Sequence, residues 1–309
     1  MAGLLSRLIS DRDPLLLSAV ALVSINSAAH LLASLTKDRK VHDVFTTGSL
    51  VASAATSLGV MAKKCGDKGE ALPLRPIILT AAVTIWGIRL GTHLARRDRL
   101  LEAASDSKED DEYRISLSEP PSNVLLGDFP TRYGGDWLTQ SAWSWIALLP
   151  VTMACRHPPS SAPMDLAALL SIGGCVGGIA FEAVADHQKT VSKRQKGQEG
   201  MWVDSGLWYY SRHPNYFGET MFWSSLYLVA SKAIPTWTAA SPAFVVLWIY
   251  NITVTNLEHR YDTKFNANHD YFSYKWDTSV LLPWPKPAPI PRDDDLYHDR
   301  SNHSMDRQV

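Results

Sequence analysis

The sequence predicts an all-α fold, a polytopic transmembrane bundle of about seven helices. The prediction rests on long, nearly uncharged stretches and on charged residues that gather between them. A helix needs about 20 mostly apolar residues to cross the hydrocarbon core of a bilayer. The mean hydropathy of -0.10 hides this pattern, because charge concentrates at 96–119, at 186–204 and after 258.

The segments that combine sufficient length with little charge are 14–35, 43–62, 76–94, 137–155, 164–185, 214–230 and 236–257. Asn26 and His30 are the strongly polar interruptions of the first, and the third is apolar up to Arg89. The second and fifth are rich in small residues, which let helix backbones approach closely. Tryptophans in the fourth are placed as in an interfacial belt. Buried helices of a soluble protein rarely give so many segments of this kind.

Basic residues beside the spans predict the orientation, since cytosolic loops of membrane proteins carry the excess of lysine and arginine. The loops after the first, third, fifth and seventh spans are the more basic ones. We therefore expect a multi-pass protein with a lumenal or external N-terminus and a cytosolic C-terminus. The charged segment 102–121 is expected to be a cytosolic loop. The proline-rich, acidic tail 285–309 is expected to be disordered.

Composition excludes several classes of protein. The chain has 30 Lys and Arg residues against 31 Asp and Glu residues, so no basic field favours nucleic acid as a partner. Cys65, Cys155 and Cys175 are widely spaced, which excludes a disulfide scaffold and a zinc site built on cysteine pairs. We expect neither a metal nor a nucleic acid.

A first group of candidate site residues closes the fifth span. On a helix Glu182, Asp186, Lys189 and Lys193 share one face, because they follow one another at spacings of four, three and four. Carboxylates that enter a membrane span are costly unless they have partners or ligands. The alternative is a helix end whose carboxylates are solvated or paired with the lysines.

A second group lies in 206–219. Pro214 suits the first turn of a helix, and the free N–H groups there favour a phosphate. Arg212 and His213 add donors suited to phosphate. Arg212, Asn215 and Glu219 are expected on one face, which carries Glu219 into the membrane. The alternative is a structural ion pair between Glu219 and Arg212.

A third group, Glu258, His259, Arg260 and Tyr261, closes the last span. A basic helix end that obeys the positive-inside rule explains it equally well. The predicted orientation nevertheless brings all three groups to the same membrane face.

The core Arg212-His213-Pro214-Asn215-Tyr216-x-Gly218-Glu219 resembles the signature of the steroid 5-alpha-reductase C-terminal superfamily. It is most similar to the fungal and bacterial branch formerly described as a domain of unknown function. Further similar pieces follow in order: Trp86-Gly87-x-Arg89-Leu90 with Arg96-Arg97, Glu112-Tyr113-Arg114, Phe181-Glu182-x-x-Ala185-Asp186-x-Gln188-Lys189, and Glu258-His259-Arg260 through Pro283-Trp284. The resemblance divides the chain into N-terminal helices at 1–75, a steroid-reductase-like membrane domain at 76–284 and the tail at 285–309.

The resemblance implies a seven-helix enzyme of the endoplasmic reticulum that takes NADPH from the cytosol and reduces carbon–carbon double bonds in steroids, sterols or long-chain enones. Positions that match the dinucleotide-holding residues of the steroid reductases are Asp186, Lys193 or Arg194, Asn215, Glu219, His259 and Arg260. Those reductases also carry a catalytic Glu and Tyr in their N-terminal helices, and neither is placed within 1–75.

Taken with the phosphate-binding features of the second group, the resemblance implies a dinucleotide at the cytosolic mouth, with Arg212 and His213 among its contacts, and an alkene of a lipid or steroid-like substrate among the helices. Tyr216 is the candidate proton donor, near Glu219, while Tyr209, Tyr210 and Tyr261 stay open. One alternative is a membrane methyltransferase of the isoprenylcysteine or phospholipid type, which binds S-adenosylmethionine. Another is a non-catalytic sterol-binding or scaffold protein.

Overall fold

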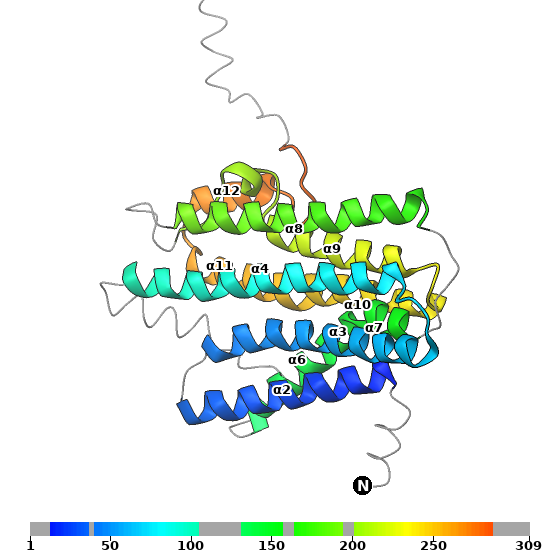
Figure 1. Cartoon of the computed structure of the whole chain (residues 1–309). Helices are drawn as coiled ribbons and strands as arrows, with labels where there is room; N and C mark the ends of the chain where they lie inside the picture. Colours follow the sequence, from blue (N-terminus) through cyan, green and yellow to red (C-terminus); the bar gives the residue numbers. More distant parts are fainter. Residues whose placement is uncertain (1–12, 37–39, 105–130, 157–163, 194–200, 287–309) are drawn as a thin grey trace, which may run out of the picture.

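The computed structural model of the chain describes residues 13–36, 40–104, 131–156, 164–193 and 201–286. These residues form helices and no strand, so the all-α prediction is confirmed (Figure 1). In chain order the elements are α2 (Pro14–Thr36), α3 (Lys40–Lys68), α4 (Leu74–Ala104), α6 (Thr131–Ala147), α7 (Leu149–Arg156), α8 (Leu166–Ser192), η1 (Gly206–Tyr209), α9 (Pro214–Ala230), η2 (Thr236–Ala239), α10 (Ala240–Trp248), η3 (Ile249–Val254), α11 (Thr255–Lys264) and α12 (His269–Asp277). Most of the predicted loop 102–121 and tail 285–309 lies outside the described residues.

The described residues contain 5 helical stretches that are long and apolar enough to cross a membrane, and these are 14–32, 44–68, 74–96, 166–192 and 236–264. The last runs through η2, α10, η3 and α11 as one continuous helix. The chain is therefore a multi-pass membrane protein. The second and fifth predicted spans, rich in small residues, are among the 5.

The predicted span 137–155 differs from expectation, since it consists of two helices that meet at Leu148. Pro150 explains the interruption, because proline lacks an N–H and its ring clashes with the carbonyl four residues earlier. The short helix α7 that follows is buried from Leu149 to Cys155. It lies inside the bundle instead of facing lipid.

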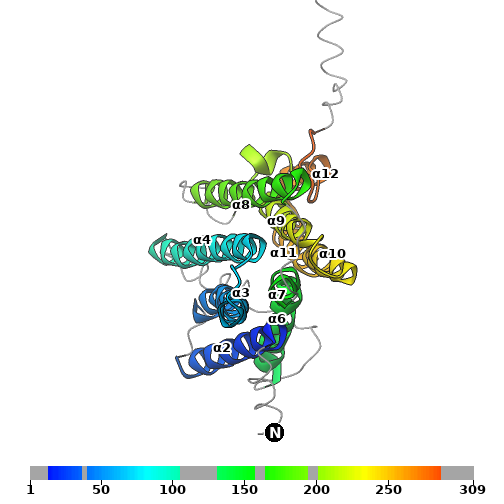
Figure 2. The same cartoon turned by 45° about the vertical axis from the view of Figure 1, so that its right-hand side comes forward.

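The helices form two layers. Figure 2 shows α2, α3, α4 and α8 stacked in one layer, with α6, α7, α9, α10 and α11 beside them. Aromatic rings fill the space between α4 and α9: the Trp86 ring stacks on Phe222 at 5.6 Å and meets Trp223 edge-on at 5.1 Å between centroids. Inside a bilayer such contacts stabilise the bundle through van der Waals packing, because lipid tails are as apolar as the side chains.

Glycines bring α8 and α9 into direct backbone contact. A Cβ atom added to Gly178 would lie 2.7 Å from the carbonyl oxygen of Gly218 and 2.7 Å from the amide nitrogen of Phe222. One added to Gly218 would lie 2.7 Å from the amide nitrogen of Glu182. No other residue type fits at this crossing, and the crossing places Glu182 beside the start of α9.

The last span contains a π-helical turn, η3, between α10 and α11. In this wider turn the Thr255 hydroxyl donates to the carbonyl of Tyr250, five residues earlier, at 3.0 Å. A π turn inserts one extra residue into an α-helix and is frequent at functional sites. It sets the rotation of α11, which carries Glu258, relative to α10.

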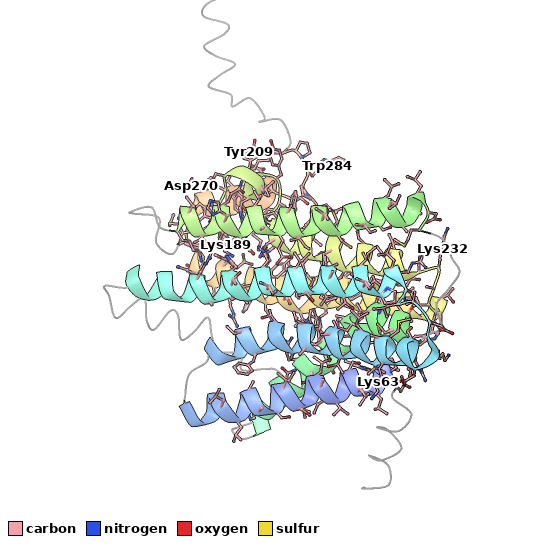
Figure 3. The ribbon with its side chains drawn as sticks, viewed as in Figure 1. Lys63, Lys189, Tyr209, Lys232, Asp270 and Trp284 are labelled. Atoms are coloured by element: carbon pink, nitrogen blue, oxygen red, sulfur yellow. The ribbon has the colours of Figure 1, made fainter. Side chains whose placement is uncertain are left out.

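The two ends of the bundle carry different residues. Figure 3 shows Lys63 and Lys232 at one end and Lys189 and Asp270 at the other. We call the second the Lys189 end, and α4 and α8 end there while α9 begins there. The three predicted groups of site residues all belong to elements that meet at this end.

The orientation prediction has a direct test. In sealed microsomes a protease tag before Met1 is expected to be protected, while a tag after Val309 is cleaved, because the more basic loops lie at the Lys189 end. Immunoblotting with and without detergent measures the result. Equal cleavage of both tags would show that the chain crosses the membrane an even number of times.

Candidate functional site

Arg89 on α4 binds two carboxylates of α8. Its guanidinium donates to Glu182 at 2.6 Å and forms a second, short ion pair with Asp186. The Trp86 indole N–H, one turn earlier on α4, donates to the other oxygen of Glu182 at 3.0 Å. The side chains of Glu182 and Asp186 are 5% and 9% exposed, so the charges lie inside the bundle. Buried carboxylates of this kind persist because the guanidinium compensates them.

Glu219 adds a third carboxylate to this group. It lies one turn after Asn215 on α9, close enough to Glu182 and Asp186 for like-charge repulsion. Arg89 thus faces three carboxylates, and the Nε2 atom of His93 lies 3.8 Å from Asp186. The group, which we call the carboxylate cluster, has three carboxyl groups around one guanidinium and can accept hydrogen bonds or a cation from a ligand.

A second ionic network joins the start of α9 to α11. Arg212 forms a short ion pair with one oxygen of Glu258, and the His213 Nε2 atom lies 2.7 Å from the other. The backbone N–H of Arg212 donates to the carbonyl of Ser279 at 2.8 Å. Arg212 therefore precedes α9, so the prediction that it shares a helix face with Asn215 and Glu219 is wrong, and its ion pair goes to Glu258 instead of to Glu219 as in the alternative.

Side chains of α12 bind to this network from its outer side. Lys275 binds Asp262 at 2.5 Å and lies 3.5 Å from Glu258. The Tyr271 hydroxyl donates to Asp262 at 3.0 Å, and the Tyr274 hydroxyl donates to the carbonyl of Trp208 at 2.9 Å. Burial raises the pKa values of both tyrosines above the ordinary value, so each phenol keeps its proton at neutral pH.

The N-terminus of α9 has no side-chain cap. His213 occupies the N-cap position, yet its side chain makes no capping hydrogen bond, and Pro214 follows it. Two buried atoms beside it, Arg212 Nε and Asn215 Oδ1, have no hydrogen-bond partner within the described part of the chain. Buried polar groups normally have partners, so these atoms and the helix N-terminus suit a polar ligand with a negative charge.

The length of α9 places this N-terminus near the membrane boundary. With 17 residues the helix is about 26 Å long at 1.5 Å per residue, shorter than the hydrocarbon core of about 30 Å. The 31-residue α4 and 27-residue α8 extend further on the same side. A ligand at the start of α9 would therefore lie between longer helices, with Glu219 below it toward the bilayer centre.

The remaining predicted site residues are distributed around this N-terminus. Asp186 belongs to the carboxylate cluster, and Tyr216 is half-buried with its ring 5.9 Å from that of His213. Lys193 caps the C-terminus of α8 and is half-buried. His259 is exposed on α11, and its neighbour Arg260 is half-buried. Arg194 lies outside the described residues.

Sequence reasoning missed the partners that hold these residues. The motif that contains Trp86 and Arg89 does not by itself show that these side chains bind Glu182, and the third group does not show that Glu258 pairs with Arg212 and His213. The signal was present in the spacing, since Trp86 and Arg89 are three residues apart and share one face of α4. Nothing in the sequence showed which face of α4 meets α8.

His213 predicts a pH dependence. Burial lowers its pKa below the ordinary value of 6.5, although the bond to Glu258 opposes the shift. The unfolded chain therefore binds a proton at higher pH than the folded one. The free energy of unfolding is expected to fall as the pH drops below about 6.5 toward the lowered pKa.

Thermal unfolding at about pH 7.5 and about pH 5.5, on either side of the ordinary histidine pKa, measures this dependence. The variant His213→Gln should show a smaller difference between the two pH values than the wild type. His259→Gln, which changes an exposed histidine one helix away, is the control and should keep the wild-type difference. An unchanged difference in His213→Gln contradicts the assignment.

Comparison with known proteins gives a family without an assigned activity. A family model with the description "Protein of unknown function (DUF1295)" matches residues 29–278, more than half of the chain. No curated protein and no solved structure matches. The match spans α3 through α12 and includes every residue of the carboxylate cluster.

Proposed function

Because the chain belongs to the family of unknown function DUF1295, we propose its activity from the site itself. We propose a membrane-embedded, NADPH-dependent reductase of a carbon–carbon double bond in a steroid, sterol or other lipid-like enone. The resemblance to the steroid 5-alpha-reductase superfamily supports this proposal. So does the meeting of the three predicted groups at one end of the bundle, which we assign to the cytosolic face of the endoplasmic reticulum.

The observation that carries the proposal is the uncapped N-terminus of α9. Its N–H groups and the unsatisfied Nε atom of Arg212 suit phosphate oxygens. One turn deeper, the carboxylate of Glu219 can accept hydrogen bonds from a carboxamide. A ligand with phosphates at the membrane boundary and a carboxamide toward the bilayer centre matches this order of groups. NADPH is such a ligand.

Different residues of this chain would then have different roles in the reaction. A bound NADPH would supply the hydride. Asn215 and Glu219 would orient the carboxamide, and the buried rings of Trp86, Phe222 and Trp223 would keep water from the substrate side of the cluster. Tyr216 is the candidate donor of the proton, because its phenol lies at the start of α9 beside the proposed ligand.

The carboxylate cluster, with three acidic side chains around one arginine, favours a second candidate. S-adenosylmethionine carries a sulfonium and an ammonium group, and carboxylates compensate cations inside a membrane protein. A membrane methyltransferase would use Glu182, Asp186 and Glu219 for this purpose. It has no need of an uncapped helix N-terminus next to Arg212, which is why we place it second.

Ligand-dependent stabilisation separates the candidates. The detergent-purified protein is expected to be stabilised by NADPH, by about 2.7 kcal/mol at one hundred times the dissociation constant. Melting curves with NADPH, NADH, S-adenosylmethionine or no ligand measure it. Stabilisation by S-adenosylmethionine alone supports the methyltransferase. Stabilisation by neither ligand, together with stabilisation by a sterol, supports a non-catalytic binding protein.

Glu219→Gln tests the deeper part of the site. The variant is expected to fold at least as well as the wild type without ligand, because it removes a buried charge that repels Asp186. It should lose most of the stabilisation that NADPH confers, since a carboxylate accepts stronger hydrogen bonds than an amide does. Melting curves with and without NADPH give both quantities.

Glu70→Gln is the matched control, since this exposed carboxylate lies in the loop between α3 and α4. It should keep the full effect of NADPH. A Glu219→Gln protein that responds to NADPH like the wild type removes Glu219 from the cofactor site and leaves it as a structural charge.

A further inference from the structure

A rigid aromatic surface covers one flank of the Lys189 end. It consists of Tyr209 and Tyr210 at the end of η1 and of Leu282 and Trp284 in the segment that follows α12. All four are exposed, Trp284 at 70% and Leu282 at 62%. We call residues 279–286 the strap. In Figure 3 Tyr209 and Trp284 project from the outer side of the bundle, beyond α8.

The strap is held firmly against the loop before α9. The N–H of Trp284 donates to the carbonyl of Tyr210 at 3.0 Å, and the Ser211 hydroxyl donates to the carbonyl of Leu281 at 2.8 Å. The Lys286 ammonium lies 4.3 Å from the centroid of the Tyr209 ring. These contacts hold the backbone that carries the exposed side chains, although the strap has no helix or sheet of its own.

Contacts with α8 give the depth of this surface. The N–H of Leu207 donates to the Gln188 side chain at 2.9 Å, and the Trp208 indole donates to the carbonyl of Ala185 at 3.0 Å. Ala185 lies about 10 Å before the end of α8 at Ser192, at 1.5 Å per residue. Because α8 exceeds the hydrocarbon core by a similar length, a core that begins at the start of α8 would end near Ala185, and η1 with the strap bonded to it would then lie at the boundary between acyl chains and headgroups.

The chemistry of the surface matches that boundary. Tyrosine and tryptophan side chains have an apolar body and a polar tip, and they are enriched where hydrocarbon meets water. The surface continues an apolar side of α8, where Val184 and Val191 are 48% and 41% exposed. Lys286 adds a cation at the rim, which suits lipid phosphate.

We propose that Tyr209, Tyr210, Leu282 and Trp284 dock into the headgroup boundary of the membrane leaflet at the Lys189 end, with Lys286 facing lipid phosphate. The docking has a consequence for the site. The strap binds the backbone of Arg212 through Ser279, so the lipid surface fixes the position of the Arg212–Glu258 pair. This inference does not depend on the proposed reductase activity.

Spin labels measure the depth directly. Leu282→Cys and Trp284→Cys are labelled in the full chain and reconstituted into vesicles of phosphatidylcholine and phosphatidylserine. The native cysteines Cys65, Cys155 and Cys175 are buried and should not take up the label in the folded protein. Asp270→Cys, on the exposed side of α12, is the control for a position in water.

The ratio of oxygen to nickel-chelate accessibility is expected to be severalfold higher at 282 and 284 than at 270, because oxygen concentrates in lipid and the chelate in water. Size-exclusion chromatography shows whether a substitution disturbs folding. If one of the two labelled variants does not fold, the other still gives the result. A ratio at both positions equal to that at 270 overturns the proposal. So does spectral broadening at 284 that disappears on dilution with unlabelled protein, since a second copy of the chain would then cover the surface.

Discussion

Arg89→Ala is expected to destabilise the protein by about 3–5 kcal/mol, since removing one partner of a buried ion pair leaves the other charge uncompensated. The loss of stability should be at the upper end of this range, because Arg89 compensates both Glu182 and Asp186 and Glu219 lies close by. Heat or denaturant unfolding in detergent, followed by size-exclusion chromatography, measures the change.

Arg96→Ala is the matched control, because Arg96 is exposed on the same helix about two turns further on. It should unfold close to the wild type. The triple variant Arg89→Met, Glu182→Gln, Asp186→Asn should recover much of the lost stability, since the two carboxylates that bind Arg89 lose their charges together with it. A destabilisation of Arg89→Ala no greater than that of Arg96→Ala contradicts the buried cluster.

Gly178→Ala is expected to be the second most harmful change. A methyl group there meets backbone atoms of α9 at 2.7 Å, so α8 and α9 must move apart. Overpacking of this kind typically costs about 1–3 kcal/mol, and more where the obstacle is backbone. The separation also displaces Glu182 and Glu219, so the response to NADPH should weaken along with the melting temperature.

Gly173→Ala, five residues earlier on α8, is the control, because a Cβ atom there meets nothing within 4 Å. It should be neutral or slightly stabilising, as alanine favours helix over glycine. Equal melting temperatures for the two variants would contradict the close crossing of α8 and α9.

The helices could be predicted from the sequence because their signal is local. A run of apolar residues suffices to place α2, α4 and α8. The glycines of α8 predict that another helix crosses it closely, but they do not show which helix. The break at Leu148 was missed although Pro150 is visible in the sequence, because the hydropathy of 137–155 is continuous across it. Hydropathy averages over a window and does not register a single missing N–H.

The sequence predicted which end of the bundle the candidate residues share, but not how they pair. Asp186, Asn215 and Glu219 are brought to one end of the bundle, as the spacing and the basic loops indicated. Arg212 was assigned to the face of α9 by spacing alone, yet the helix begins after it and Arg212 binds Glu258, 46 positions away. Which cation compensates which carboxylate depends on helix rotation, and rotation is set by long-range packing that no local pattern encodes.

The π turn at 249–254 gives one such rotation a definite cause. An α-helix advances about 100° per residue, so one additional residue in η3 turns everything after it by that angle. Glu258 points toward Arg212 and His213 only in this phase. The π turn therefore matters at the present length of the span: the same residues wound as a regular α-helix would turn Glu258 away by about 100°, whereas deleting one residue within η3 would give a regular helix that keeps Glu258 near its present direction.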